Sequence, residues 1–288
     1  GSVSRGGRAS GADRRNPTAN FMKEPSMYKV LVTDYVWPTL DPERRVLEEI
    51  GGELIVAPNG DEATLAELAR EADGILTCFA KVTPKVIDAA PKLKVIGRYG
   101  IGVDNIAVDH ATQKNIVVTN VPEYCLDEVS DHAMALLLAC IRKIPVYNQA
   151  VKQRVWDTKV GMPMYRIRGR TLGLAGYGKI GRLVMSKAQA FGMNVIVYDP
   201  YVPAEAVAER GGRKVDFDTL LRESDYISIH APLTPETHHL FNEAAFRKMK
   251  PTAVIVNTSR GPLIDTAALA RALREGIIAF AGLDVLPS

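Results

Sequence analysis

With 288 residues, 47% of them hydrophobic and 24% charged, the chain is typical of a globular protein of about two domains, which excludes global disorder and a coiled coil. The formal net charge is +3, and residues 1–26 hold five basic and two acidic side chains, so the rest of the chain is neutral and nucleic-acid binding is not expected. The longest apolar run, residues 133–141, is too short for a bilayer, which takes about 20 residues, so we expect no membrane partner.

Residues 1–26 are polar and contain arginine and serine without an apolar core, so they do not resemble a secretory signal. We expect a disordered leader or a segment added for expression, with a weak transit peptide as the alternative and Met27 as a plausible native start. The three cysteines, Cys78, Cys125 and Cys140, form no C-x-x-C pair. This pattern favours a reducing compartment, and we expect a cytoplasmic protein.

Short apolar strands alternate with helices from Lys29 onward. The expected strands are residues 29–33, 54–56, 74–77, 95–97 and 116–119, and the expected helices are residues 42–50, 62–72, 84–89 and 104–114. Strands that alternate with helices form right-handed βαβ units around a parallel sheet. We therefore expect a flavodoxin-like domain over residues 27–124.

A long apolar helix is expected next, capped by Asp127 and ending at Ile144, before Pro145. Its apolar residues nearly surround it, which indicates deep packing or an interface. Residues 146–170 have weak periodicity, so we expect an arm or a linker there.

A second alternating series begins at Arg170. The expected strands are residues 171–174, 194–198, 226–230, 253–257 and 277–283, with a short one near Val215, and the expected helices are residues 179–191, 218–222, 243–249 and 266–274. The fold class is therefore α/β, with two doubly wound parallel-sheet domains. The second domain covers residues 125–288 and includes the apolar helix and the arm.

A dinucleotide-binding fingerprint, G-x-G-x-x-G, lies between an expected strand and an expected helix. It is formed by Gly176, Tyr177, Gly178, Lys179, Ile180 and Gly181. The first glycine permits a tight turn, the second leaves room for a pyrophosphate, and the third lets the helix approach the strand. The free N–H groups of Lys179 and Ile180 can bind phosphate oxygens.

Asp199 ends the next expected strand, at the spacing the fingerprint requires. Its carboxylate can accept hydrogen bonds from ribose hydroxyls and would repel a 2′-phosphate, and no arginine follows it directly. The sequence therefore favours NAD over NADP.

Three later strands end in polar segments, where ligands of open parallel sheets bind. We expect these to line the cofactor cleft: His230, Ala231 and Pro232, then Thr258, Ser259 and Arg260, and finally Asp284. A guanidinium there can bind a substrate carboxylate and polarise its keto oxygen, and an aspartate can hold a nicotinamide carboxamide. The alternative is that Arg260 and Asp284 pair with each other or cap helices.

Another glycine-rich turn follows the strand at residues 95–97. It contains Arg98, Gly100, Ile101 and Gly102, and its N–H groups could bind a carboxylate, although a simple βα turn is the alternative. His230 is the first candidate for a proton donor, but a lone histidine at a strand end is more often structural. Because no H-E-x-x-H motif or Cys/His cluster occurs, we expect no metal site.

Together these segments resemble the D-isomer-specific 2-hydroxyacid dehydrogenase family over about residues 28–288. The matching motifs occur in family order at residues 98–105, 172–182, 230–237, 256–261 and 282–285. The resemblance implies NAD-dependent hydride transfer between a 2-keto acid and a D-2-hydroxy acid. It also implies that residues 27–124 are the substrate domain and that residues 125–288 are a larger Rossmann NAD-binding domain.

The resemblance further assigns roles to individual residues. It implies Arg260 as the catalytic, substrate-binding arginine, substrate-carboxylate contacts from the Gly100–Gly102 amides, and Asp284 on the cofactor side. It also implies that the loop from Phe79 to Lys81 faces substrate. Lys81 and Arg98 would suit an extra negative group such as a phosphate, so glyoxylate, hydroxypyruvate, phosphoglycerate and bulkier keto acids all stay open.

The resemblance implies a homodimer formed through the NAD domain. Residues 124–130 are similar to the branch of NAD-dependent corepressors, so an NAD(H)-responsive dimeric binding protein is the alternative function. Family members carry a catalytic glutamate, a catalytic histidine and a helix returning to the substrate domain, all of which would fall after Ser288. We therefore expect this chain to be a truncated, catalytically impaired form of a longer enzyme, with a natural short form as the alternative.

Overall fold

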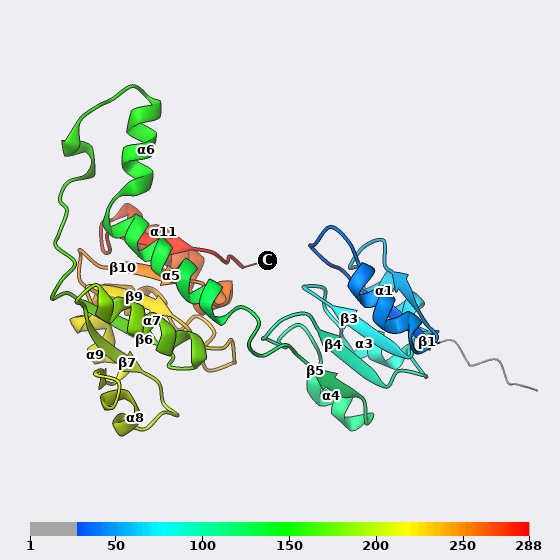
Figure 1. The fold of residues 1–288 in the computed structure, drawn as a ribbon. Helices are drawn as coiled ribbons and strands as arrows, with labels where there is room; N and C mark the ends of the chain where they lie inside the picture. The colour runs from blue at the N-terminus through cyan, green and yellow to red at the C-terminus, as the bar shows by residue number, and fades with distance from the viewer. Residues whose placement is uncertain (1–27, 288) are drawn as a thin grey trace, which may run out of the picture. The chain divides into compact units, whose positions relative to one another are not determined.

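A computed structural model describes residues 28–287, and the expected leader at residues 1–26 lies outside the described residues. The chain divides into two compact units. The first contains residues 28–99 and 105–119, and the second contains residues 100–104 and the chain from Asn120 onward. Each unit has its own parallel sheet, which confirms the expected α/β class (Figure 1).

The first unit is built on a five-stranded parallel sheet of order β2-β1-β3-β4-β5, the flavodoxin-like order. Its strands are β1 (Tyr28–Val32), β2 (Gly52–Val56), β3 (Gly74–Thr77), β4 (Val95–Arg98) and β5 (Val117–Thr119), and its helices are α1 (Asp41–Glu48), α2 (Glu62–Ala69), α3 (Pro84–Asp88) and α4 (Val108–Gln113).

Leu31, Ile75 and Ile96 of this sheet pack against α2, α3 and α4 in one hydrophobic core. Helix α1 borders an apolar cavity of about 480 Å³ that is also lined by Val30, Val95 and other residues of the sheet.

The second unit is built on a six-stranded parallel sheet of order β11-β10-β9-β6-β7-β8. Its strands are β6 (Thr171–Ala175), β7 (Asn194–Tyr198), β8 (Arg213–Lys214), β9 (Tyr226–Ile229), β10 (Val254–Asn257) and β11 (Phe280–Leu283). Its helices are α5 (Leu126–Ile141), α6 (Ile144–Lys152), α7 (Lys179–Ala190), α8 (Ala204–Ala208), α9 (Phe217–Glu223), α10 (Glu243–Lys248) and α11 (Thr266–Arg274), with short 3₁₀ turns η1 (Thr158–Gly161) and η2 (Gly261–Leu263).

Two hydrophobic cores cover the two faces of this sheet. Val254 and Val256 face a core shared with α5 and α7, whereas Ile255 between them faces a core shared with α9, α10 and α11. This alternation follows from the two-residue period of a strand. Both faces are therefore buried, and the ends of the strands are left to carry the site.

Three local expectations were wrong. Asp127 does not cap α5, because Leu126 is already helical and Cys125 occupies the capping position. The helix ends at Ile141 rather than Ile144, because Lys143 adopts a left-handed conformation with φ of 58°. A second helix, α6, then starts with Pro145 in its first turn, so the expected arm is partly helical (Figure 1).

Helix α4 begins four residues later than expected, because Ile106 forms an isolated β-bridge with Val82 just before the helix. Helix α8 was not anticipated at all. Among the helices of residues 28–287, none combines the length and apolar character needed to cross a membrane.

Candidate cofactor and substrate site

The glycine fingerprint joins β6 to α7, and each glycine has a distinct environment. Gly176 has φ of 103°, and a Cβ there would lie 2.6 Å from the backbone carbonyl of His230. A Cβ at Gly181 would lie 2.6 Å from the Gly176 carbonyl oxygen. At Gly178 a Cβ would meet no heavy atom within 4 Å. Two of the glycines thus serve internal packing, whereas Gly178 borders open space.

That open space lies at the start of α7. The first hydrogen bond of the helix runs from Arg182 N–H to Gly178 O at 3.1 Å, which leaves the earlier N–H groups available to a ligand. The Lys179 side chain pairs with Glu123. N–H groups at the amino end of a helix attract anions, and a glycine without a side chain lets a phosphate approach. The residues present therefore fit a dinucleotide pyrophosphate.

Asp199 follows β7 and bridges two backbone segments. Its Oδ2 accepts a hydrogen bond from Tyr177 N–H at 2.8 Å, and its Oδ1 accepts one from Tyr201 N–H at 2.9 Å. A neighbouring cavity of about 580 Å³ is lined by Asp199, Arg213 and other residues around β7 and β8. The Arg213 guanidinium pairs with Glu223, so it is already engaged by a carboxylate.

The loop after β10 is held against β9. Ser259 Oγ donates a hydrogen bond to Ile229 O at 3.0 Å, and Asn257 Nδ2 donates one to Arg260 O at 2.8 Å. Asn257 Oδ1 also accepts a hydrogen bond from Ser259 N–H. Asn257 thus fixes the backbone from which Arg260 projects. The sequence analysis did not single out this asparagine, although it closes the strand that precedes the arginine.

The Arg260 guanidinium binds Asp104 rather than Asp284. Its Nε and Nη2 donate to Asp104 Oδ1 at 3.0 and 2.8 Å, and its Nη1 donates to Ser259 O at 2.8 Å. A side chain at Gly102 would overlap the guanidinium. The structure therefore brings Arg260 together with the glycine-rich loop at residues 100–104, and the alternative pairing with Asp284 is wrong.

Asp284 follows β11 and contacts a helix instead. Its Oδ1 lies 3.2 Å from Nε2 of His132 on α5. Its N–H donates to Asn257 O at 3.0 Å, which continues the pairing of β11 with β10. His132 could not be recognised from the sequence, because nothing in the apolar pattern of α5 shows which turn of the helix meets the end of β11.

His230 is partly buried at the carboxyl end of β9, next to the glycine loop. Its N–H donates to Ala175 O at 2.7 Å, and its Nε2 lies 2.9 Å from Ser228 Oγ. Removal from solvent lowers the pKa of His230 to about 4. The imidazole is therefore neutral near pH 7, which suits packing beside the fingerprint better than proton donation.

In the first unit, a polar network holds the loop from Cys78 to Lys81. The Asp34 carboxylate accepts hydrogen bonds from Cys78 N–H at 2.9 Å and from Phe79 N–H at 2.7 Å. Burial raises the pKa of Asp34, but the hydrogen bonds from Phe79, Thr33 and Cys78 outweigh it and hold the pKa below its ordinary value.

The same network reaches Arg98. Asn105 Nδ2 donates to Ala80 O at 2.9 Å, and Asn105 Oδ1 accepts from Arg98 Nε at 3.1 Å. Asp34 and Asn105 are thus positioning residues for the loop and for Arg98. Sequence reasoning missed Asp34, although its place directly after an expected strand was a usable signal.

Comparison with known proteins agrees with this geometry. Residues 134–288 match the family model described as "D-isomer specific 2-hydroxyacid dehydrogenase, NAD binding domain". A glyoxylate reductase of Thermococcus litoralis is 45% identical over 228 residues, which cover 77% of this chain and 69% of the relative. This chain belongs to the D-isomer-specific 2-hydroxyacid dehydrogenase family. The expected family and its NAD cofactor are thereby confirmed.

Other family members match over most of this chain. A D-3-phosphoglycerate dehydrogenase of Methanocaldococcus jannaschii is 44% identical over 263 residues, which cover 90% of this chain and 49% of the relative. The chain thus spans about half the length of that relative. The crystal structure of a D-lactate dehydrogenase from Aquifex aeolicus with NAD and lactic acid superposes with a TM-score of 0.83 at 30% identity, covering 90% of this chain and 77% of that one.

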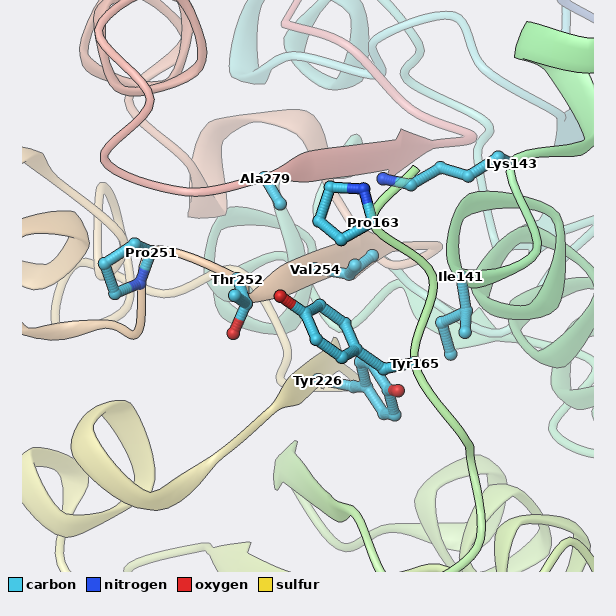
Figure 2. A pocket seen from close by; sticks show the side chains of 9 residues that line it. All are labelled: Ile141, Lys143, Pro163, Tyr165, Tyr226, Pro251, Thr252, Val254 and Ala279. Carbon is cyan, nitrogen blue, oxygen red and sulfur yellow. The ribbon is translucent and has the colours of Figure 1, made fainter. Parts of the chain in front are cut away.

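A separate cavity of about 230 Å³ lies at the other end of the sheet in the second unit (Figure 2). It is lined by the first residues of β9 and β10, Tyr226 and Val254, and by Lys143, whose ammonium lies 3.9 Å from the centre of the Phe280 ring. Ligands of open parallel sheets bind beyond the carboxyl ends of the strands, whereas this cavity lies at their amino ends. It is therefore not part of the cofactor site. Within residues 28–287 no cluster of three or more His, Cys, Asp or Glu residues could hold a metal ion.

Proposed function

We propose that this chain is the substrate- and NAD-binding part of an oxidoreductase that interconverts a 2-keto acid and a D-2-hydroxy acid. The observation that carries the proposal is the Arg260 guanidinium. It projects from the end of β10, on the same sheet whose β6 ends in the glycine fingerprint, and it packs against Gly102. An anion-binding cation at the dinucleotide edge of a Rossmann sheet is what reduction of a keto acid requires.

The residues of the second unit divide the cofactor between them. Gly176–Gly181 would hold the pyrophosphate, Asp199 the adenosine ribose and Asp284 the nicotinamide carboxamide. The remaining contacts would come from His230, Ala231, Pro232, Thr258 and Ser259. When bound, the nicotinamide supplies or accepts the hydride. The Arg213 guanidinium is paired with Glu223, and the Asp199 carboxylate beside it would repel a 2′-phosphate.

Arg260 would orient the substrate and stabilise charge on its keto oxygen. Asp104 and the Ser259 carbonyl hold the guanidinium in place, and an arginine has five N–H donors, so donors are left over for a substrate carboxylate. The N–H groups of the Gly100–Gly102 loop, whose Gly102 packs against the guanidinium, would complete the carboxylate site. From the first unit we propose Lys81 and Arg98 as further substrate-binding cations, which would favour a substrate with a second negative group.

The proposal includes a homodimer formed through the second unit. Helix α6 and the segment after it expose apolar side chains, among them Ile144, Val151 and Trp156, which is 91% exposed. Several exposed apolar side chains on one segment favour a protein contact. We also propose residues 27–124 as the substrate domain and residues 125–288 as the NAD domain. We further propose a cytoplasmic location, which the three free cysteines support, and no nucleic-acid or membrane partner.

The test follows NADH and a substrate analogue separately. The chain is titrated with NADH, and binding is followed by fluorescence. Oxamate, an unreactive analogue of a 2-keto acid, is then added. Parallel samples receive glyoxylate or hydroxypyruvate instead, and turnover is followed by the loss of NADH absorbance. We expect NADH to bind and oxamate to change its fluorescence. The variant Arg260→Met should keep NADH affinity within about threefold and lose the response to oxamate, because it removes the anion contact.

The matched control is Arg271→Met, which removes an exposed arginine paired with Glu243 on the outer helices. It should behave as the unaltered chain. Failure of NADH to bind, or an oxamate response that survives Arg260→Met, would contradict the proposal. NADH-promoted dimerisation without any oxamate response or turnover would favour the alternative of an NAD(H)-responsive binding protein.

A further inference from the structure

A close approach between α5 and β11 fixes the surroundings of Asp284. A Cβ at Gly282 would lie 3.2 Å from Cys140 Sγ and 3.3 Å from Leu136 Cβ, so the helix rests directly on the strand because Gly282 has no side chain. Residues four apart share one face of a helix, so His132 precedes Leu136 on the same face. His132 lies one helical turn before Leu136 on α5, and Asp284 lies two residues after Gly282, just past the end of β11. The two side chains therefore meet.

The contact itself joins a carboxylate to an imidazole. His132 Nε2 lies 3.2 Å from Asp284 Oδ1, and within residues 28–287 no other charged group lies within ion-pair distance of that carboxylate. The backbone of Asp284 is already fixed by its N–H bond to Asn257 O at 3.0 Å. The side chain, which is 47% exposed, depends on His132 to select one orientation.

We propose that His132 is a positioning residue that orients Asp284 toward the nicotinamide end of the cofactor. This inference rests on the proposed function, in which Asp284 holds the carboxamide. A carboxylate that is held in one rotamer before the ligand arrives loses less conformational freedom on binding. His132 thereby raises affinity for the nicotinamide half of the cofactor without touching the adenosine half.

The experiment compares two ligands that differ only in the nicotinamide. NADH and ADP-ribose are titrated by calorimetry against the chain and the variants His132→Ala and His132→Gln. We expect His132→Ala to weaken NADH binding about two- to fivefold, the range that an exposed ion pair is worth, and to leave ADP-ribose binding unchanged. His132→Gln places an amide N–H near the position of Nε2 and should restore NADH affinity.

Two controls sharpen the result. His110→Ala removes a histidine that pairs with Asp88 in the same way, at 2.9 Å, in the first unit, and should leave both affinities unchanged. In an Asp284→Asn background, His132→Ala should have little further effect, because residues that act as a unit are not additive.

Three results would overturn the inference while the proposed function stands. The first is an equal loss of affinity for NADH and for ADP-ribose in His132→Ala. The second is an unchanged NADH affinity in His132→Ala. The third is a full loss of NADH affinity from His132→Ala in the Asp284→Asn background. If the unaltered chain binds neither NADH nor ADP-ribose, the proposed function itself fails and this inference fails with it.

Discussion

Replacing Gly178 with alanine should separate cofactor binding from folding. Gly178 has φ of −71°, a conformation open to any residue, and a Cβ there would meet no protein atom within 4 Å. Because Gly178 occupies the N-cap of α7, the substitution should cost at most about 1 kcal/mol of unfolding free energy. The added methyl group would instead occupy the space assigned to the pyrophosphate.

The expected loss of affinity follows from crowding. An extra methyl group in a well-packed contact costs about 1–3 kcal/mol, which corresponds to NADH binding weakened by roughly 5- to 150-fold. Fluorescence titration with NADH measures this loss, and chemical denaturation of the same preparation measures the unfolding free energy.

Gly176→Ala is the matched comparison, because it should damage the fold instead. Its φ of 103° disfavours any side chain, by about 1–2 kcal/mol, and its Cβ would overlap the His230 carbonyl, which adds about 1–3 kcal/mol. The reasoning is refuted if Gly178→Ala binds NADH within twofold of the unaltered chain. It is also refuted if the two variants lose equal stability.

Three further predictions concern single charges. Asp199→Asn should shift the preference toward NADPH by about fivefold or more, since removing a charge near the 2′-phosphate is worth about 1–4 kcal/mol; the ratio of the two dissociation constants measures it. Asp34→Ala should cost about 1–3 kcal/mol at pH 7, because the Cys78 and Phe79 N–H groups lose their charged acceptor. Since the pKa of Asp34 is lowered on folding, the contribution of Asp34 to stability is present above its ordinary pKa of 3.8 and is lost as pH falls below it. Denaturation curves of the unaltered chain and of Asp34→Ala should therefore converge in acid. Because the pKa of His230 falls from 6.5 to about 4, its imidazole NMR signals should titrate only below about pH 5. The contribution of His230 to stability should be complete above pH 6.5 and should decline as pH drops toward 4. An NMR titration of His230 near pH 6.5 would contradict the lowered pKa.

The sequence by itself determined the α/β class, the two alternating series and the cofactor fingerprint. These features are local. A buried strand needs a short apolar run, a helix needs its own periodicity, and the turn at Gly176 needs a residue that tolerates positive φ. Asp199 was found the same way, because a βαβ unit places the acidic residue at a nearly fixed distance along the chain.

Only the tertiary structure decided which charged groups meet. Arg260 binds Asp104 across 156 positions of sequence, and Asp34 reaches the loop at Phe79 across 45. His132 contacts Asp284 because Gly282, which has no side chain, allows α5 to pack closely against β11. Exposed ion pairs are weak and leave little trace in local patterns, so their partners depend on how strands and helices are stacked, which follows from packing the whole sheet rather than from any one segment.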